Sequence, residues 1–288
     1  MFLALDVGNT HTVIGGFSTV GGEKSLHQKS PQKTWRISTH PFGMGVGMGV
    51  GTGDELILKL QGLLAQVDVR WSQVTGIGVS SVVPEFTRML RGAIPEDLLH
   101  VIDWHGPFSF DLNMLAPEQV GVDRLVNAEA AVRAYGAPCI IIDSGTATTL
   151  CALAPSPRGS GGRPEYLGGA IMPSIDLMLE ALVGKTAQLF HVELKPPSQA
   201  IGRNTQEALQ SGIVLGCASM LEGMIGRLRE ELVLKCGVES IPVVATGGKA
   251  ELMKALLTST TRGVSDFDPD LTLKGICFLY DQRNKPQT

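Results

Sequence analysis

A short motif occurs twice in this chain, each time directly after an apolar run. It reads DVGNTHT at residues 6–12 and DSGTATT at residues 143–149, so an Asp, a Gly two positions later and a Thr six positions later are shared. An Asp-x-Gly tripeptide alone is expected about once by chance in a chain of this length. The shared setting, an apolar strand before a polar turn and a second strand after it, therefore predicts a duplicated α/β unit.

The apolar pattern around each copy repeats in the same order. Runs near the N-terminus predict an antiparallel meander, which is followed by alternating helices and strands. The elements predicted for the first half are strands at 2–5, 12–17, 34–38, 76–83 and 99–102 and a helix at 56–67. Those predicted for the second half are strands at 139–142, 148–153, 166–171 and 241–245 and helices at 175–182 and 205–232. A helix at 123–135 joins the halves, and the expected domains are 1–121 and 122–288.

Composition restricts the class of protein. The chain has 24 Lys and Arg residues against 28 Asp and Glu, a net charge of -4, and 43% hydrophobic residues, which is typical of a folded globular protein. No basic run suited to nucleic acid is present, and no uncharged apolar stretch reaches the ~18 residues of a membrane span. Asp6 interrupts the apolar N-terminus, which we interpret as a strand and not a signal segment. The five cysteines form no CxxC pair, which favours reduced thiols and a cytoplasmic protein.

The duplicated turns have the chemistry of phosphate sites. A Gly lets a ligand approach the backbone closely, and hydroxyl and amide groups beside it donate hydrogen bonds to phosphoryl oxygens. The candidate phosphate ligands are Gly8, Asn9, Thr10, Gly145, Thr146 and Thr149. If both turns face one cleft, Asp6 and Asp143 converge on one Mg²⁺, which prefers carboxylate and water oxygens. The alternative is that these residues only shape two tight hairpins.

Two further segments are candidates for the same site. Gly247 and Gly248 follow a buried strand and precede a helix, where free N–H groups face a nucleotide, although a Gly pair there is also simply a tight turn. Asp123 and Arg124 lie at a loop-to-helix junction. Asp123 either caps the helix or, with an ordinary pKa of about 4, accepts the proton of a substrate hydroxyl. Arg124 is either solvated or holds phosphoryl or substrate oxygens.

Together these segments resemble those of the type III pantothenate kinases, members of the actin, sugar-kinase and heat-shock ATPase superfamily. The resemblance extends almost from end to end of the chain. Residues 6–10 and 143–149 are similar to the family's two phosphate motifs, 121–124 to its substrate and base motif, and 246–248 to its adenosine segment. Further matching segments are Trp35-Arg36, 81–84, 168–173, 184–187, 202–205 and 271–275.

The resemblance implies an α/β fold of two RNase-H-like (actin-like) domains, each a mixed five-stranded sheet flanked by helices, with the ATP cleft between them. It implies a homodimer that transfers the γ-phosphoryl group of ATP to the terminal hydroxyl of pantothenate, the first step of coenzyme A biosynthesis. Mg²⁺ and a monovalent cation, K⁺ or NH₄⁺, are the implied cofactors. Asp123 falls at the position of the general base, and Gly121, Arg124 and Thr186 fall where the family binds pantothenate.

Three positions depart from the family's pattern. Cys151 stands where an aspartate accompanies the monovalent cation, and a neutral thiol is a poor ligand for a hard cation. Met114 replaces a substrate-contacting tyrosine, and Ser174 replaces a glycine. Two alternatives therefore stay open: a catalytically silent regulatory or binding homologue, and a kinase of the same fold with another small acceptor. A glycine-rich stretch at 43–51 is either a flap over the site or a neutral insertion.

Overall fold

The computed structural model describes residues 1–18, 30–39, 52–156, 162–249, 252, 254, 257 and 263–283. The glycine-rich stretch at 43–51 lies outside these residues. Contacts divide the chain into two compact units. Unit 1 comprises Met1–Phe108, Ala116–Ala130 and Asp270–Thr288, and unit 2 comprises Ser109–Leu115 and Ala131–Pro269. The division differs from the expected domains of 1–121 and 122–288, since the start of the helix at 122–135 and the C-terminal helix both pack within unit 1.

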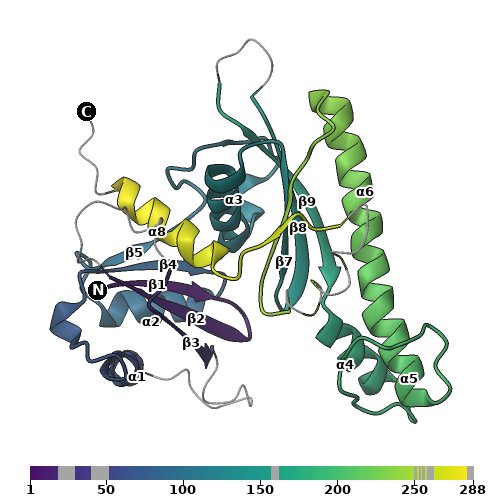
Figure 1. Cartoon of the computed structure of the whole chain (residues 1–288). Coiled ribbons are helices and arrows are strands. Elements are labelled where there is room, and N and C mark those ends of the chain that lie inside the picture. Colours follow the sequence, from purple (N-terminus) through teal and green to yellow (C-terminus); the bar gives the residue numbers. More distant parts are fainter. Residues whose placement is uncertain are drawn as a thin grey trace. The chain divides into compact units, whose positions relative to one another are not determined.

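Unit 1 contains a mixed sheet of five strands in the order β3-β2-β1-β4-β5 (Figure 1). The strands are β1 (Phe2–Val7), β2 (His11–Phe17), β3 (Lys33–Ser38), β4 (Gly76–Ser81) and β5 (Leu99–Val101). β1 to β3 form the predicted antiparallel meander, and β4 and β5 continue the sheet parallel to β1. One face packs on α1 (Gly53–Ala65) and α2 (Pro84–Ala93), through leucines that recur at helical spacing and Phe86.

The other face of this sheet packs on α8 (Leu271–Arg283), a helix that the sequence pattern did not predict. The helix comes close because the sheet has glycines beneath it. A Cβ atom on Gly15 would lie 2.9 Å from Leu273, and one on Gly78 would lie 2.6 Å from Ile276. This close packing places the C-terminal helix in unit 1 (Figure 1).

Unit 2 contains a mixed sheet in the order β11-β10-β7-β8-β9-β6. The strands are β6 (Asp111–Leu112), β7 (Cys139–Ser144), β8 (Ala147–Ala154), β9 (Glu165–Pro173), β10 (Val243–Thr246) and β11 (Asp266–Phe267). β7 to β9 form an antiparallel meander, and β10 and β11 run parallel to β7, so the topology of unit 1 is repeated and the duplication is confirmed. The expected count of five strands is wrong for this sheet, because β6 pairs with the start of β9 as a sixth strand.

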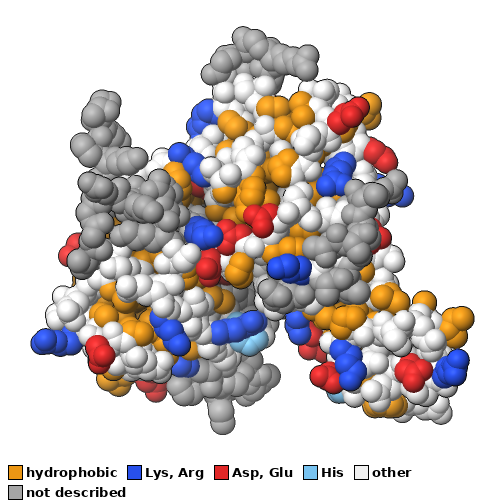
Figure 2. All heavy atoms as spheres, in the orientation of Figure 1, with side chains coloured by type: hydrophobic (Ala, Val, Ile, Leu, Met, Phe, Trp, Pro, Cys, Tyr) orange, Lys and Arg blue, Asp and Glu red, His pale blue; other side chains and the backbone are white. Residues whose placement is uncertain are grey.

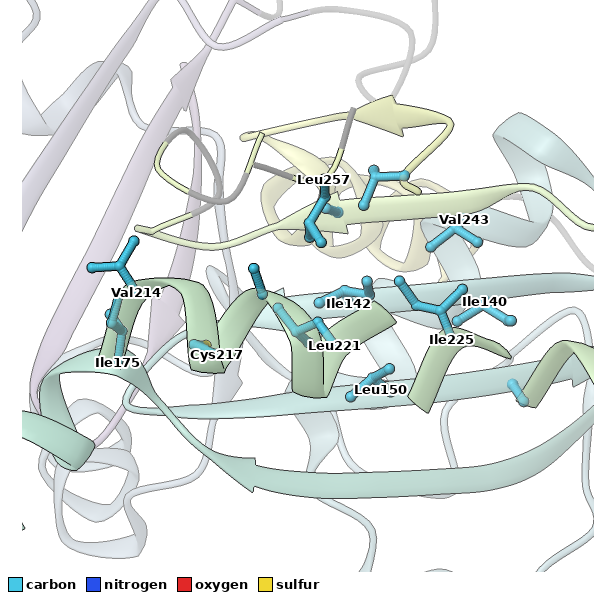
Figure 3. Packing of buried hydrophobic residues seen from close by; sticks show 14 of the residues in the cluster. Ile140, Ile142, Leu150, Ile175, Val214, Cys217, Leu221, Ile225, Val243 and Leu257 are labelled. Atoms are coloured by element: carbon cyan, nitrogen blue, oxygen red, sulfur yellow. The ribbon is translucent and has the colours of Figure 1, made fainter. Parts of the chain in front are cut away.

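The core of unit 2 lies between its sheet and a long helical segment (Figure 3). The helices are α3 (Val122–Tyr135), which crosses the division between the units, α4 (Ile175–Lys185), α5 (Thr205–Gln210) and α6 (Gly216–Cys236), with a π-helical turn at Ser211–Leu215.

In the described part of the chain, one helical segment, Thr205–Cys236, is long and apolar enough to cross a membrane by length and composition alone. Leu221 and Ile225 of this segment pack toward Ile142 and Leu150 of the sheet, so it is a core helix.

Candidate active site

The first candidate phosphate turn connects β1 to β2 in unit 1. The Gly8 N–H donates to the His11 carbonyl (3.0 Å) and closes the turn, while Asn9 and Thr10 are exposed at its tip. Asp6 is half-buried near the end of β1. The turn therefore presents polar groups to solvent, which suits phosphate, and the nearby carboxylate of Asp6 suits a cation that bridges to it.

The Gly121–Arg124 segment lies beside this turn. A Cβ atom on Gly121 would lie 3.8 Å from Val82, and the Val82 N–H donates to the carbonyl of Val7 (3.1 Å), the residue before Gly8. α3 begins one residue after Gly121. Unit 1 thus brings the first candidate phosphate turn and the predicted base motif to the same edge of its sheet.

Asp123 has a constrained and partly buried carboxylate. Its Oδ1 accepts a hydrogen bond from the Arg124 N–H (2.8 Å), and a Cβ atom on Gly121 would lie 2.5 Å from the same oxygen. Burial raises the pKa of Asp123 above its usual 3.8, although the hydrogen bond and the charge of Arg124 act in the opposite direction. The expectation of an ordinary pKa is therefore wrong, because a sequence pattern does not report how far a helix end is buried.

The second candidate phosphate turn connects β7 to β8 in unit 2. The Gly145 N–H donates to the Ala147 carbonyl (3.1 Å), Gly145 and Thr146 are exposed, and Asp143 and Thr149 are half-buried. Asp143 pairs across the hairpin with Thr149, the sixth residue after it. In unit 1 the partner of Asp6 is the seventh residue after it, Val13, so the threonines shared by the two motifs are not at equivalent strand positions.

The turn after β10 packs directly on this second phosphate turn. Gly247 has φ +97°, and a Cβ atom on it would lie 2.6 Å from Asp143 Oδ1 and from the Ser144 nitrogen. The Lys249 N–H donates to the Ser144 carbonyl (3.3 Å). Unit 2 therefore brings the predicted adenosine segment, including the exposed Gly248, together with Asp143.

An ion pair beside the second candidate phosphate turn was not predicted from the sequence. Lys249 Nζ lies 3.1 Å from Asp176 Oδ1 in the first turn of α4. Neither residue belongs to a motif that the sequence analysis recognised, and the contact joins positions 73 residues apart. Only the folded chain brings these charges to the second phosphate turn.

The donor set suits a magnesium ion that is shared with phosphate. Asp6 is paired in register with Ser80 of β4, a fully buried residue whose hydroxyl has no hydrogen-bond partner in the described structure. Carboxylate and hydroxyl oxygens are hard donors, which fit Mg²⁺. In the described ranges, no group of three or more His, Cys, Asp or Glu side chains could hold a metal. The carboxylate of Asp6 alone would therefore leave most coordination positions of such an ion to phosphate and water.

The position of Cys151 does not fit a monovalent cation. Its sulfur accepts a hydrogen bond from the Tyr166 hydroxyl (3.2 Å), and both side chains are buried. All five cysteines are free, as predicted, and four are buried. Burial raises the pKa of the neighbouring Cys139 to about 12, which shows how strongly this interior disfavours an ionised thiol.

The remaining expected positions have local structural roles. Met114 packs against Gly168, where a Cβ atom would lie 3.0 Å from its sulfur. Ser174 is the N-cap of α4, and its hydroxyl accepts from the Leu177 N–H (3.2 Å). Thr186 is exposed at the end of α4, and its hydroxyl donates to the Leu182 carbonyl (2.8 Å).

The two units share one mixed-sheet topology, and each has a glycine-containing turn after the first strand of its meander, an α/β architecture that hosts several kinds of enzyme. The family model for "Type III pantothenate kinase" matches residues 2–227. The chain is 37% identical over 294 residues to the type III pantothenate kinase of Streptomyces griseus, with 98% of each covered, and 38% identical over 285 residues to that of Rubrobacter xylanophilus, with 97% of each covered. The chain therefore belongs to the type III pantothenate kinases.

A solved structure supports the fold. A protein from Campylobacter jejuni, described as a conserved Baf family transcriptional activator, is similar with a TM-score of 0.56 and 15% sequence identity, and 98% of each chain is covered. At this identity the similarity concerns the fold alone.

Proposed function

We propose that Asp123 is the general base in the reaction of this family, the ATP-dependent phosphorylation of pantothenate that begins coenzyme A biosynthesis. The observation that carries this role is the constrained carboxylate at the start of α3, which accepts from the Arg124 N–H and lies close to Gly121, where a Cβ atom would force it to move. Burial raises the pKa of Asp123, which makes its carboxylate a better proton acceptor than an exposed one.

In this mechanism Asp123 orients the terminal hydroxyl of pantothenate and takes its proton as the new oxygen–phosphorus bond forms. The bond between the γ-phosphorus and the bridging oxygen breaks, and ADP leaves with that oxygen. The transition state is loose, so orientation and charge neutralisation matter more than a strong base. We assign the guanidinium of Arg124 to the substrate oxygens, with Gly121 and Thr186 as further pantothenate contacts because of their match to the family's motifs.

We assign the phosphates of ATP to the two glycine-containing turns. The ligands in unit 1 are Gly8, Asn9 and Thr10, those in unit 2 are Gly145, Thr146 and Thr149, and Gly247 and Gly248 bind the adenosine. Support comes from the exposed tips of both turns and from the packing of Gly247 on Asp143. Asp6 and Asp143 would hold Mg²⁺, which supplies neutralisation of the phosphate charge.

We also propose a cytoplasmic homodimer. Unit 2 exposes large apolar side chains at the end of β9, on α4 and before α5, namely Ile171, Leu177, Leu182, Phe190 and Ile201. Hydrophobic side chains are visible among charged ones on the part formed by α4 and α5 (Figure 2). Several large apolar side chains exposed on one unit are a feature of surfaces that bind another protein chain. Light scattering after gel filtration is expected to give twice the chain's mass, and Ile201→Asp is expected to lower it; a wild-type monomer would contradict the proposal.

The function is tested by ADP release from purified protein with Mg²⁺ and ATP, with and without pantothenate. We expect ADP release that depends on pantothenate. Binding of ATP without any release would instead favour the silent homologue, for which Cys151 and Met114 are the motivating departures. Release with a different hydroxyl-bearing anion would favour another acceptor on the same fold.

A further inference from the structure

Thr39 contacts the first phosphate turn from its buried side. It follows β3 directly and is 3% exposed. Its N–H donates to the Thr10 carbonyl (3.0 Å), and its hydroxyl donates to the Gly8 carbonyl (2.6 Å). The hydroxyl oxygen also lies 3.0 Å from that of Thr12. Because the single hydroxyl proton of Thr39 is given to Gly8, Thr12 is the donor in this last pair.

These bonds fix the direction of a peptide group in the turn. In a trans peptide the C=O and the following N–H point in opposite directions. The Gly8 carbonyl points inward to Thr39, so the N–H of Asn9, which belongs to the same peptide group, points away from Thr39 and toward the exposed tip. The Gly8 N–H is already used in the bond to His11 that closes the turn.

We propose that Thr39 is a positioning residue for ATP, which holds the Gly8–Asn9 peptide so that the Asn9 N–H faces a phosphate oxygen. This inference rests on the proposed function, since it takes the turn as a phosphate site. Thr39 lies 27 residues after Thr12, outside the repeated motif, and its side chain is buried. Its effect is preorganisation: the turn has its binding geometry before the nucleotide arrives.

The test compares variants that keep or remove the hydroxyl. Thr39→Val keeps the shape and the backbone N–H but removes the donor to Gly8, and Thr39→Ser restores the donor. We expect Thr39→Val to raise both the KM for ATP and the Kd of a non-hydrolysable ATP analogue about 10-fold, with the KM for pantothenate within about twofold. Thr39→Ser is expected to bind the analogue within about threefold of the wild type. Thr39→Cys, a weaker donor of similar size, is expected to lie between them.

Tyr135→Phe is the matched control, because it removes another single hydroxyl hydrogen bond, from Tyr135 to Asp266 (2.6 Å), in unit 2. We expect it to lower the melting temperature and leave analogue affinity unchanged. Wild-type affinity in folded Thr39→Val would overturn the inference, and so would equal losses in the Val and Ser variants. If Thr39→Val does not fold, wild-type affinity in Thr39→Cys overturns it. A wild-type protein that neither binds the analogue nor releases ADP refutes the proposed function itself, and the inference with it.

Discussion

The hydroxyl of Tyr166 donates a hydrogen bond of 3.2 Å to the sulfur of Cys151 inside the sheet of unit 2. Both side chains are at most 2% exposed, and Cys151 lies in β8 between Ile141 and Gly169 of the neighbouring strands. A thiol in this setting fills space and accepts a weak hydrogen bond, and it is a poor ligand for a hard cation.

Activity is therefore expected to depend little on K⁺. Pantothenate-dependent ADP release in K⁺ and in Na⁺ buffers of equal ionic strength should agree within about twofold, since the residue at position 151 supplies no hard oxygen ligand. Choline chloride is the control for ionic strength. A tenfold requirement for K⁺ would mean that other ligands hold the cation, and would contradict this prediction.

The repeated turns, both meanders and the alternation of helices and strands could be predicted, because each depends on local patterns of apolar and polar residues. Helix α8 could not be predicted, since residues 271–279 are buried on nearly all sides and lack an amphipathic period. Strands β6 and β11 have only two residues each, which is too short for a period.

The roles of the predicted site residues stay predictions, and the contacts that support those residues could not be read from the sequence. Thr39 meets Gly8 across 31 residues through the pairing of β2 with β3. Lys249, after β10, meets Asp176 of α4 across 73 residues, and the sheet places β7 and β8 between β10 and β9, the strand before α4, in an order that the sequence does not show. Such contacts depend on strand register, which one sequence without a fold does not specify.

Replacing Asp123 with Asn is expected to remove most turnover while ATP binding persists. The exchange is nearly isosteric but removes the proton acceptor, which contributes about 10²–10⁴-fold to kcat. Steady-state ADP release and titration with a non-hydrolysable ATP analogue measure the two effects. Asp97→Asn, at an exposed position, is the control and should behave as the wild type. Wild-type turnover in Asp123→Asn would exclude Asp123 as the base.

The same variant is expected to be more heat-stable than the wild type at neutral pH. The folded-state pKa of Asp123 lies above its usual 3.8, so the stability that this group contributes is present below that value and is lost as the pH rises through the folded-state pKa. The Asn side chain is uncharged, so its burial at position 123 does not carry the cost of desolvating a carboxylate. Melting curves between about pH 4 and pH 8 should show that the difference in melting temperature between Asp123→Asn and the wild type grows with pH. A difference that shrinks with pH would contradict the raised pKa.

Ser174 is expected to stabilise α4 through its hydroxyl. Its side chain caps the helix by accepting from the Leu177 N–H. Ser174→Ala should lower the free energy of unfolding by about 1 kcal/mol, whereas Ser174→Gly, which restores the residue typical of the family, should cost only a few tenths. Chemical denaturation of both variants measures this. Equal losses in the two would show that the cap is not the source of the stability.

Gly247→Ala is expected to disrupt the second phosphate turn. The residue has φ +97°, and the added Cβ would lie 2.6 Å from Asp143 Oδ1 and from the Ser144 nitrogen, so both strain and collision oppose the change. We expect a loss of about 1–3 kcal/mol in stability and a clear fall in affinity for a non-hydrolysable ATP analogue. Gly223→Ala is the matched control: this glycine lies in α6 with open space around its Cβ position, so Ala should stabilise the helix by roughly 0.5–1 kcal/mol without changing affinity. If Gly247→Ala binds the analogue as tightly as Gly223→Ala does, the turn after β10 does not shape the nucleotide site.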